Sequence, residues 1–182
     1  MRGFRPISLI LVLTLFTVAL ASGAAPPAGI QRAADLQGRF TIGFPADWQV
    51  VKLKSGMPAL AGVGPGRKGR FHLNVNVVVE ELQDPVSATA YARAARPLMA
   101  ATFHEFNVIQ EGPARIAHRD AYYRYYTWRP NTGGELYQVQ AYFTAGRLGF
   151  VLTGTTVNDP DRVRRDVPVI GEIFETFKLA TR

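Results

Sequence analysis

Three consecutive segments of alternating apolar and polar residues constrain the fold of this 182-residue chain more than any other feature. They cover residues 119–129, 136–144 and 148–155, and short turns at 131–134 and 145–146 separate them. Alternation with a period of two is typical of strands, and turns this short join antiparallel neighbours. The pattern therefore predicts a three-stranded antiparallel meander.

The rest of the chain predicts further strands and two helices. Asp84-Pro85 and Asp159-Pro160 each place a capping residue before a proline, which is typical of a helix start. Pro97 is expected to kink or divide the first helix, and Pro168 to restart the second. The order of elements favours an α+β fold, an antiparallel β-sheet flanked by helices. The additional strands are expected at 39–45, 49–53, 60–63, 71–80, 106–110 and 115–118, the last two as a pair around 111–113.

The first 25 residues have the three-part pattern of a secretory signal peptide. Arg2 and Arg5 precede an apolar run over 7–21, and small residues follow it. At ~1.5 Å per residue, this run spans roughly 22 Å as a helix, which is less than the ~30 Å hydrocarbon core of a membrane. We therefore expect an exported protein, periplasmic or extracellular, with a signal peptide at 1–25, a linker at 26–36 and a single domain at 37–180.

Composition excludes several classes of protein. The chain has no cysteine, which excludes disulfide scaffolds, zinc fingers, iron–sulfur clusters and cysteine nucleophiles. The formal net charge of +7 is compatible with an anionic partner, or with a diffuse excess of arginine. The densest basic group lies in the Gly-rich loop before residue 71, and its candidate anion contacts are Arg67, Lys68 and Arg70.

No motif predicts catalysis, and we assign no catalytic residue, metal ligand or cofactor. Residues 64–69 match G-x-G-x-x-G in letters, but a strand rather than a helix follows, so the motif does not predict a phosphate site. Ser55 and Ser87 do not lie in a G-x-S-x-G sequence. His118 and Asp120 share a predicted strand face, where a solvated polar surface explains them better than a weak metal site.

The aromatic segment 119–129 carries the candidate ligand face, formed by Tyr122, Arg124, Tyr126 and Trp128. Aromatic rings with an arginine at their edge are typical of platforms that stack sugars or bases. The same pattern is typical of a central strand packed by helices on both faces, with tyrosine hydroxyls reaching the rim. The residues alone leave both interpretations open.

Several segments together resemble a known family. They are Phe40-x-Ile42-x-Phe44-Pro45-x-Asp47-Trp48, the strand 74–79, and the segments 121–124, 138–143 and 173–178. Over about residues 37–179, this combination resembles the Mog1/PsbP-like superfamily, especially its bacterial secreted PsbP/DcrB-like members. The resemblance implies an α/β/α sandwich around an antiparallel sheet, and a role in binding, assembly or accessory work rather than catalysis.

These observations lead to one functional expectation with two alternatives. We expect an exported, non-catalytic binding or accessory protein of the cell envelope, whose partner is an unknown envelope protein or polymer. We expect no nucleic-acid partner and no stable membrane insertion after signal cleavage. The alternatives are an enzyme that acts on an envelope polymer through an unrecognised site, and a scaffold tethered to the membrane by an uncleaved signal.

Overall fold

The computed structural model describes residues 29–52, 58–67, 69–131 and 133–180. The expected signal peptide and residues Ser55 and Lys68 lie outside these ranges. The described residues form two β-sheets and two helices, so the predicted α+β class is confirmed.

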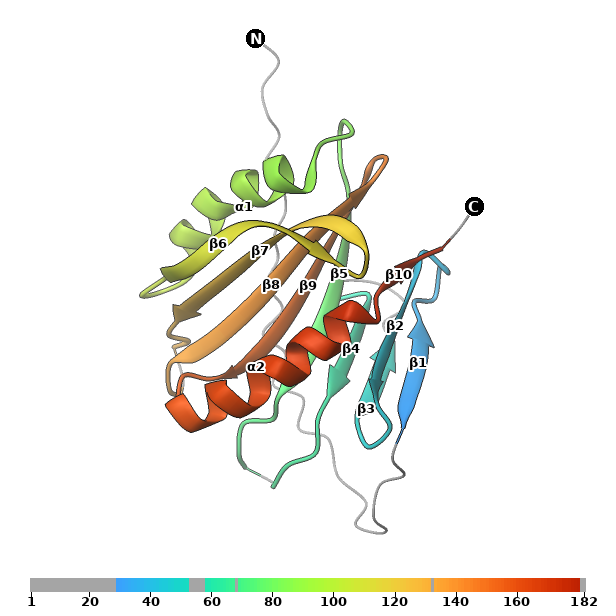
Figure 1. Cartoon of the computed structure of the whole chain (residues 1–182). Helices are drawn as coiled ribbons and strands as arrows, with labels where there is room; N and C mark the ends of the chain where they lie inside the picture. Colours follow the sequence, from blue (N-terminus) through green and yellow to red (C-terminus); the bar gives the residue numbers. More distant parts are fainter. Residues whose placement is uncertain (1–28, 53–57, 68, 132, 181–182) are drawn as a thin grey trace.

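The larger sheet is antiparallel and has seven strands in the order β3-β4-β5-β9-β8-β7-β6 (Figure 1). The predicted meander is present as β7, β8 and β9, and β6 extends it by pairing with β7. The strands are β3 (Gln49–Lys52), β4 (Leu60–Val63), β5 (Asn74–Glu81), β6 (Asn107–Ile116), β7 (Arg119–Trp128), β8 (Leu136–Ala145) and β9 (Leu148–Val157).

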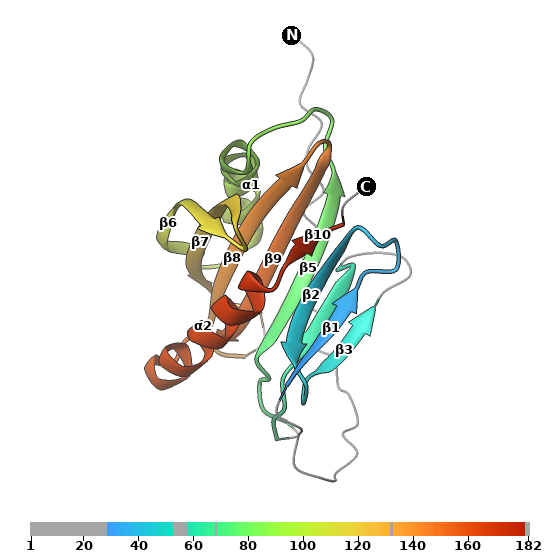
Figure 2. The ribbon, with the colours of Figure 1, turned by 45° about the vertical axis from the view of Figure 1, so that its right-hand side comes forward.

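The smaller sheet has the order β1-β2-β10, with β1 at Ile30–Ala34, β2 at Phe40–Pro45 and β10 at Lys178–Leu179. The linker expected at 26–36 is therefore wrong for Ile30–Ala34. The sequence of β1 has no clear alternation, and only Ala33 is buried, so backbone pairing with β2 holds this strand. Figure 2 shows β10 running from the end of α2 towards β2.

The two helices, α1 (Ala88–Thr102) and α2 (Pro160–Glu175), cover opposite faces of the larger sheet. Helix α1 packs on Tyr122, Tyr142 and Val151. Helix α2 and the smaller sheet pack on the opposite face of the same strands, where Phe143, Phe150 and Leu152 lie. The layers expected from the family resemblance are therefore present.

The helix starts and prolines differ in part from the prediction. Asp159 caps α2 as predicted, because its side chain accepts a hydrogen bond from the Arg162 backbone N. The cap of α1 is Ser87, whose Oγ accepts from the Ala90 backbone N at 3.1 Å, and not Asp84. Both helices continue through Pro97 and Pro168 without division. The carbonyl that each proline leaves without its helical donor belongs to an exposed arginine, Arg93 or Arg164, where water is available.

Strand β6 corrects the prediction of two short strands at 106–110 and 115–118. The strand is continuous, with a bulge between Val108 and Gln110. Because β6 is the edge of the sheet, it has a neighbouring strand on one side only, and edge strands are where a proline such as Pro113 is tolerated. The true turn lies at Ala117 and His118, which have φ values of 51° and 61°. Neither residue is a glycine, so the sequence carries no signal for this left-handed turn.

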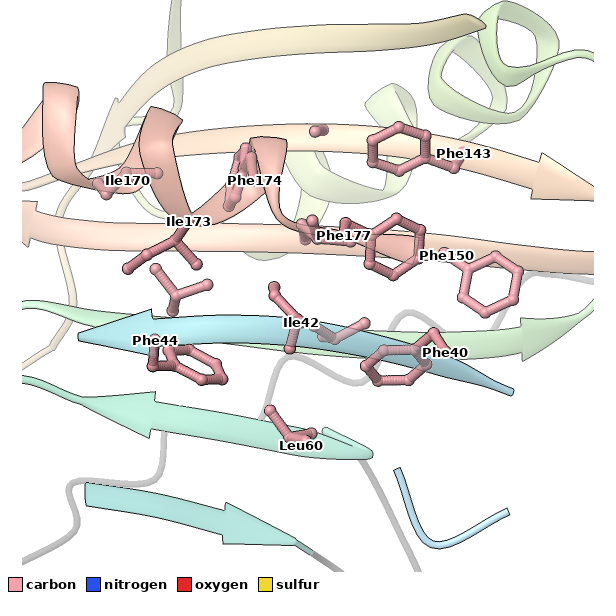
Figure 3. Close-up of a cluster of buried hydrophobic side chains, with 14 of the residues drawn as sticks. Phe40, Ile42, Phe44, Leu60, Phe143, Phe150, Ile170, Ile173, Phe174 and Phe177 are labelled. Carbon is pink, nitrogen blue, oxygen red and sulfur yellow. The ribbon is translucent and has the colours of Figure 1, made fainter. Parts of the chain in front are cut away.

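The largest core cluster joins β2 to α2 and to the centre of the larger sheet (Figure 3). Phe177 stacks on Phe143 with 5.0 Å between the ring centroids and packs at 5.5 Å from Phe40. Helix α2 approaches β9 so closely that a Cβ at Gly154 would lie 2.4 Å from the Ile170 side chain. Trp48 is also buried, and it stacks on Phe44 at 5.9 Å.

Candidate functional site

Strand β7 divides its aromatic residues between two environments. Its even-numbered side chains are the candidate ligand face predicted from the sequence, and they lie beneath α1. Their exposed fractions are only 4% for Tyr122, 0% for Arg124, 0% for Tyr126 and 6% for Trp128. The structure therefore gives these four side chains the core position that was the second interpretation, and they present no open stacking surface.

Arg124 is the centre of this buried face. Its Nε donates to Glu111 Oε2 at 2.6 Å, Nη1 donates to the Tyr142 hydroxyl at 2.9 Å, and Nη2 donates to the Ala92 carbonyl oxygen at 2.9 Å. Glu111 also accepts from Arg96 of α1 at 2.6 Å. One guanidinium thus connects β7 to β6, β8 and α1. These partners compensate for the burial of the charge, and removing one of them is expected to lower the free energy of unfolding by several kcal/mol.

Glutamines on β8 extend the buried polar contacts along the sheet. Gln138 accepts hydrogen bonds from the Tyr126 hydroxyl and the Trp128 indole, and it donates to Thr155 at 2.8 Å. Burial raises the pKa of Tyr126, so its hydroxyl remains a neutral donor. These groups satisfy one another, which makes the layer under α1 a structural network rather than a ligand site.

Glu80 is the exception in this layer. Its Oε2 accepts a hydrogen bond from the Tyr91 hydroxyl at 2.7 Å, while Oε1 has no partner among the described residues. Burial raises the pKa of Glu80, and the Tyr91 hydrogen bond opposes this rise. Glu80 is therefore a buried carboxylate whose protonation is coupled to the seating of α1.

The open aromatic surface lies on the other face of β7. Tyr123 and Tyr125 of β7 and Tyr137 of β8 are partly exposed there. The ring centroids of Tyr123 and Tyr125 are 5.4 Å apart, and those of Tyr125 and Tyr137 are 6.3 Å apart. The exposed Gln110 of β6 donates to the Tyr123 hydroxyl at 2.8 Å. We refer to Tyr123, Tyr125, Tyr137 and Gln110 as the tyrosine row.

Helix α2 borders the tyrosine row without covering it. Glu175 Oε2 accepts a hydrogen bond from the Ala117 backbone N at the β6–β7 turn, so this side of α2 faces β7. Val167 and Gly171 precede Glu175 at four-residue intervals and share its side of the helix. A Cβ at Gly171 would meet no atom within 4 Å, so this stretch of α2 leaves open space.

The sequence pattern singled out β7, and the face that it offered as a candidate is buried, in agreement with the second interpretation. Alternation separates Tyr122 from Tyr123, yet it does not say which face a helix covers. The two faces differ in polar content. Arg124 lies on the buried face, and the buried Gln138 and Gln140 of β8 extend that face. Tyr137 on the neighbouring strand would then have completed the opposite row.

The other candidates lie apart from the tyrosine row. Arg67 and Arg70 are exposed in the loop before β5, and Lys68 is outside the described residues. The Arg162 side chain donates to the Phe71 carbonyl oxygen at 3.1 Å, which places this loop beside the start of α2. His118 lies in a turn rather than on the strand face that we expected to share with Asp120.

Metal clusters and membrane-spanning helices are both absent from the described ranges. There, no three His, Cys, Asp or Glu side chains gather as a metal site would require. Neither described helix has the length and apolar character needed to cross a membrane.

Comparison with known proteins places this architecture in a family. The family model for DcrB matches residues 65–166, which is more than half of the chain. The chain belongs to the DcrB family. The match runs from the loop before β5 into α2, so it includes both faces of β7. No curated protein matches the chain.

Solved structures of the Mog1/PsbP-like superfamily share the fold over most of this DcrB-family chain. Cyanobacterial PsbP from Synechocystis sp. PCC 6803 has a TM-score of 0.61 at 16% identity, covering 88% of this chain and 98% of its own. LpqN from Mycobacterium tuberculosis has a TM-score of 0.63 at 13% identity, covering 84% and 92%. The Ran-binding protein Mog1p from Saccharomyces cerevisiae has a TM-score of 0.57 at 9% identity, covering 84% and 96%. The expected superfamily is confirmed, and at these identities the likeness is one of fold.

Proposed function

We propose that this protein is an exported, non-catalytic accessory protein of the cell envelope that binds its partner through the tyrosine row. The observation that carries the proposal is the contrast within β7, where one aromatic face is fully buried and the other is partly exposed on a rigid sheet. Partly exposed tyrosines combine a large apolar surface with a hydroxyl, which is why they are enriched in binding surfaces.

The relatives support the envelope assignment. LpqN is described as involved in cell envelope biogenesis, and Mog1p as a Ran-binding protein. Both share the fold, which therefore serves binding and accessory roles elsewhere. The signal-peptide pattern at 1–25 supports export of this chain, to the periplasm or the medium.

The distribution of polar groups supports a non-catalytic role. Burial raises the pKa of the enclosed groups Glu80, Tyr91, Tyr126 and Tyr142, and of Tyr125 and Tyr137 in the tyrosine row. Away from the row, the hydrogen bond between the exposed Glu105 and Arg129 lowers the pKa of Glu105 and raises that of Arg129. The buried set is enclosed by α1, and the tyrosines of the row lack a carboxylate or imidazole partner within the row. The exposed Glu105 binds Arg129 and His104, and its pKa shift comes mainly from the Arg129 hydrogen bond, as in an ordinary surface ion pair.

Site-directed photo-crosslinking in a bacterium tests this proposal. Benzoylphenylalanine replaces Tyr125 in one tagged variant, and it replaces the exposed Arg93 on α1 in the matched control. We expect export, removal of residues 1–25 shown by N-terminal sequencing, and a defined envelope adduct from position 125 but not from position 93. Retention in the cytoplasm, or equal crosslinking from both positions, would overturn the proposal.

A further inference from the structure

We propose that the ligand of the tyrosine row is an uncharged stretch of the glycan backbone of an envelope polymer, with its sugar rings stacked on successive tyrosines. This inference rests on the proposed function and names the chemical class of its partner.

The ring spacing fits a chain of single rings. The centroid separations of 5.4 and 6.3 Å are comparable with the length of one sugar unit, so neighbouring tyrosines would meet neighbouring sugars. The rings are inclined to one another by 62° and 45°. In the Tyr123–Tyr125 pair the edge of one ring meets the face of the other, so the row presents separately oriented ring surfaces to a ligand. It has no coplanar platform of the kind that a flat fused ring system would need.

The electrostatics of the row select an uncharged ligand. Its four side chains contain three phenol hydroxyls and one amide, and none of them is charged. Nucleic-acid surfaces add lysine and arginine to their aromatic residues, because phosphate contacts supply much of the affinity. The exposed Arg67 and Arg70 lie in the loop before β5, and two strands, β9 and β8, separate β5 from β7. The exposed Arg119 shares the odd-numbered face of β7 but lies at its first residue, next to the β6–β7 turn where the oppositely charged Glu175 binds, so charge of one sign does not accumulate beside the row. A polyhydroxyl ligand complements hydroxyl and amide groups without needing a counter-charge.

The row is also held in position before a ligand arrives. Tyr125 and Tyr137 pack partly against the main core cluster. Gln110 fixes the Tyr123 hydroxyl from β6. Gly112 of β6 lies beside the Tyr123 ring, and a Cβ at this position would be 3.5 Å from the ring. A larger residue at position 112 would therefore cover part of the ring. Side chains that are ordered in advance lose little entropy on binding.

The phenol groups of Tyr125 and Tyr137 remain uncharged over a wide pH range. Burial raises the pKa of Tyr125, and the neighbouring Tyr123 raises it further. Burial has the same effect on the pKa of Tyr137, with Tyr125 as the smaller cause. Tyr125 and Tyr137 therefore keep their protons and can donate hydrogen bonds to sugar oxygens.

Calorimetric titration of the full exported protein with chitohexaose and with cellohexaose tests the inference. We expect saturable binding of at least one of these neutral oligosaccharides. Tyr125→Ala should weaken that binding about ten-fold or more, because it removes the ring that lies between Tyr123 and Tyr137. Tyr125→Phe keeps the ring and should retain most of the affinity. Arg67→Glu/Arg70→Glu should leave it unchanged.

Several outcomes would overturn the inference. They are the absence of oligosaccharide binding by folded wild type, equal binding by wild type and Tyr125→Ala, and binding only to heparin or to glycolipid vesicles. If position 125 still crosslinks to an envelope protein while both oligosaccharides fail to bind, the glycan inference falls and the proposed function stands. If crosslinking also fails, both fall together.

Discussion

The two faces of β7 differ although they come from the same ten residues. The face under α1 encloses a charged guanidinium and tyrosines whose hydroxyls bond to other side chains. The face beside α2 carries tyrosines of the same size that remain partly exposed, because α2 packs over β9 and β8 and leaves this part of β7 uncovered. Under α1 the buried polar groups bind one another, with Glu80 Oε1 as the exception, while the polar groups of the open face remain accessible.

This contrast assigns different roles to chemically similar residues. Tyr126 and Tyr125 are adjacent in sequence, but the first is fully buried and the second is partly exposed. Substitutions on the α1 face should act on the free energy of unfolding, and substitutions on the α2 face should act mainly on binding. The following measurements would break or sharpen that division.

The largest effect is expected from Arg124→Ala. The substitution leaves Glu111, the Tyr142 hydroxyl and the Ala92 carbonyl without their shared donor, and breaking such a buried pair costs about 3–5 kcal/mol. Arg96→Ala is the matched control, since Arg96 binds the same carboxylate but its side chain is 54% exposed. That control should cost no more than about 1 kcal/mol. Equal losses in urea unfolding would show that α1 does not shield Arg124.

A smaller effect on the free energy of unfolding is expected from the protonation of Glu80 as the pH changes. Burial raises its pKa in the folded chain, so the folded state holds this proton more tightly than the unfolded state. Below the ordinary glutamate pKa both states are protonated, and stability is lost as the pH rises from there through the raised value. The slope cannot exceed about 1.4 kcal/mol per pH unit for one proton. Glu80→Gln should remove this contribution, and parallel stability profiles for wild type and variant would contradict the assignment.

Tyr123→Ala should cost the fold still less. Aromatic cross-strand neighbours contribute about 0.2–1 kcal/mol relative to alanine, and Tyr123 is only partly buried. Urea unfolding measures this cost, and the oligosaccharide titration measures the loss of binding on the same preparation. A cost of several kcal/mol would show that the open face is also part of the core.

The smallest effect on stability is expected from Arg67→Glu/Arg70→Glu. Both residues are exposed in the loop before β5, and such substitutions change stability by about 0.5 kcal/mol or less. If the basic excess acts locally, the variant should elute from a heparin column at lower salt than wild type. Identical elution at identical stability would mean that the positive charge acts diffusely.

Elements with a strong local sequence pattern were predicted correctly, and elements without one were missed. Alternation identified β7, β8 and β9, and the Asp159 cap marked the start of α2, because burial and capping leave residue-level patterns. Strand β1 was missed because its pairing with β2 uses backbone groups that any sequence provides. The break predicted in β6 arose because Gly112-Pro113 is compatible with an edge strand as well as with a turn.

Only the tertiary structure shows which face of β7 stays exposed. The side chains of α1 that pack on β7 and β8 include Ala88, Ala92 and Ala95, which are small and give a weak apolar pattern. Nothing in that pattern says that α1 covers the even-numbered face of β7. Alternation therefore predicts which aromatic residues of β7 share a face, but it does not predict which of the two faces is exposed.

The pairing of β10 with β2 has a consequence for the order of folding. Lys178 pairs with Thr41 and Leu179 with Phe40, so β2 acquires this neighbour only after almost all of the described chain has been made. The hairpins from β6 to β9 need only local contacts, whereas closure of β2 onto α2 and β10 spans the domain, and contacts of such long range form slowly. We expect a chain that stops before Phe177 to form hairpins but no closed core. If the protein is exported as proposed, a domain that closes only with its last segment would remain unfolded enough to pass through a secretion channel.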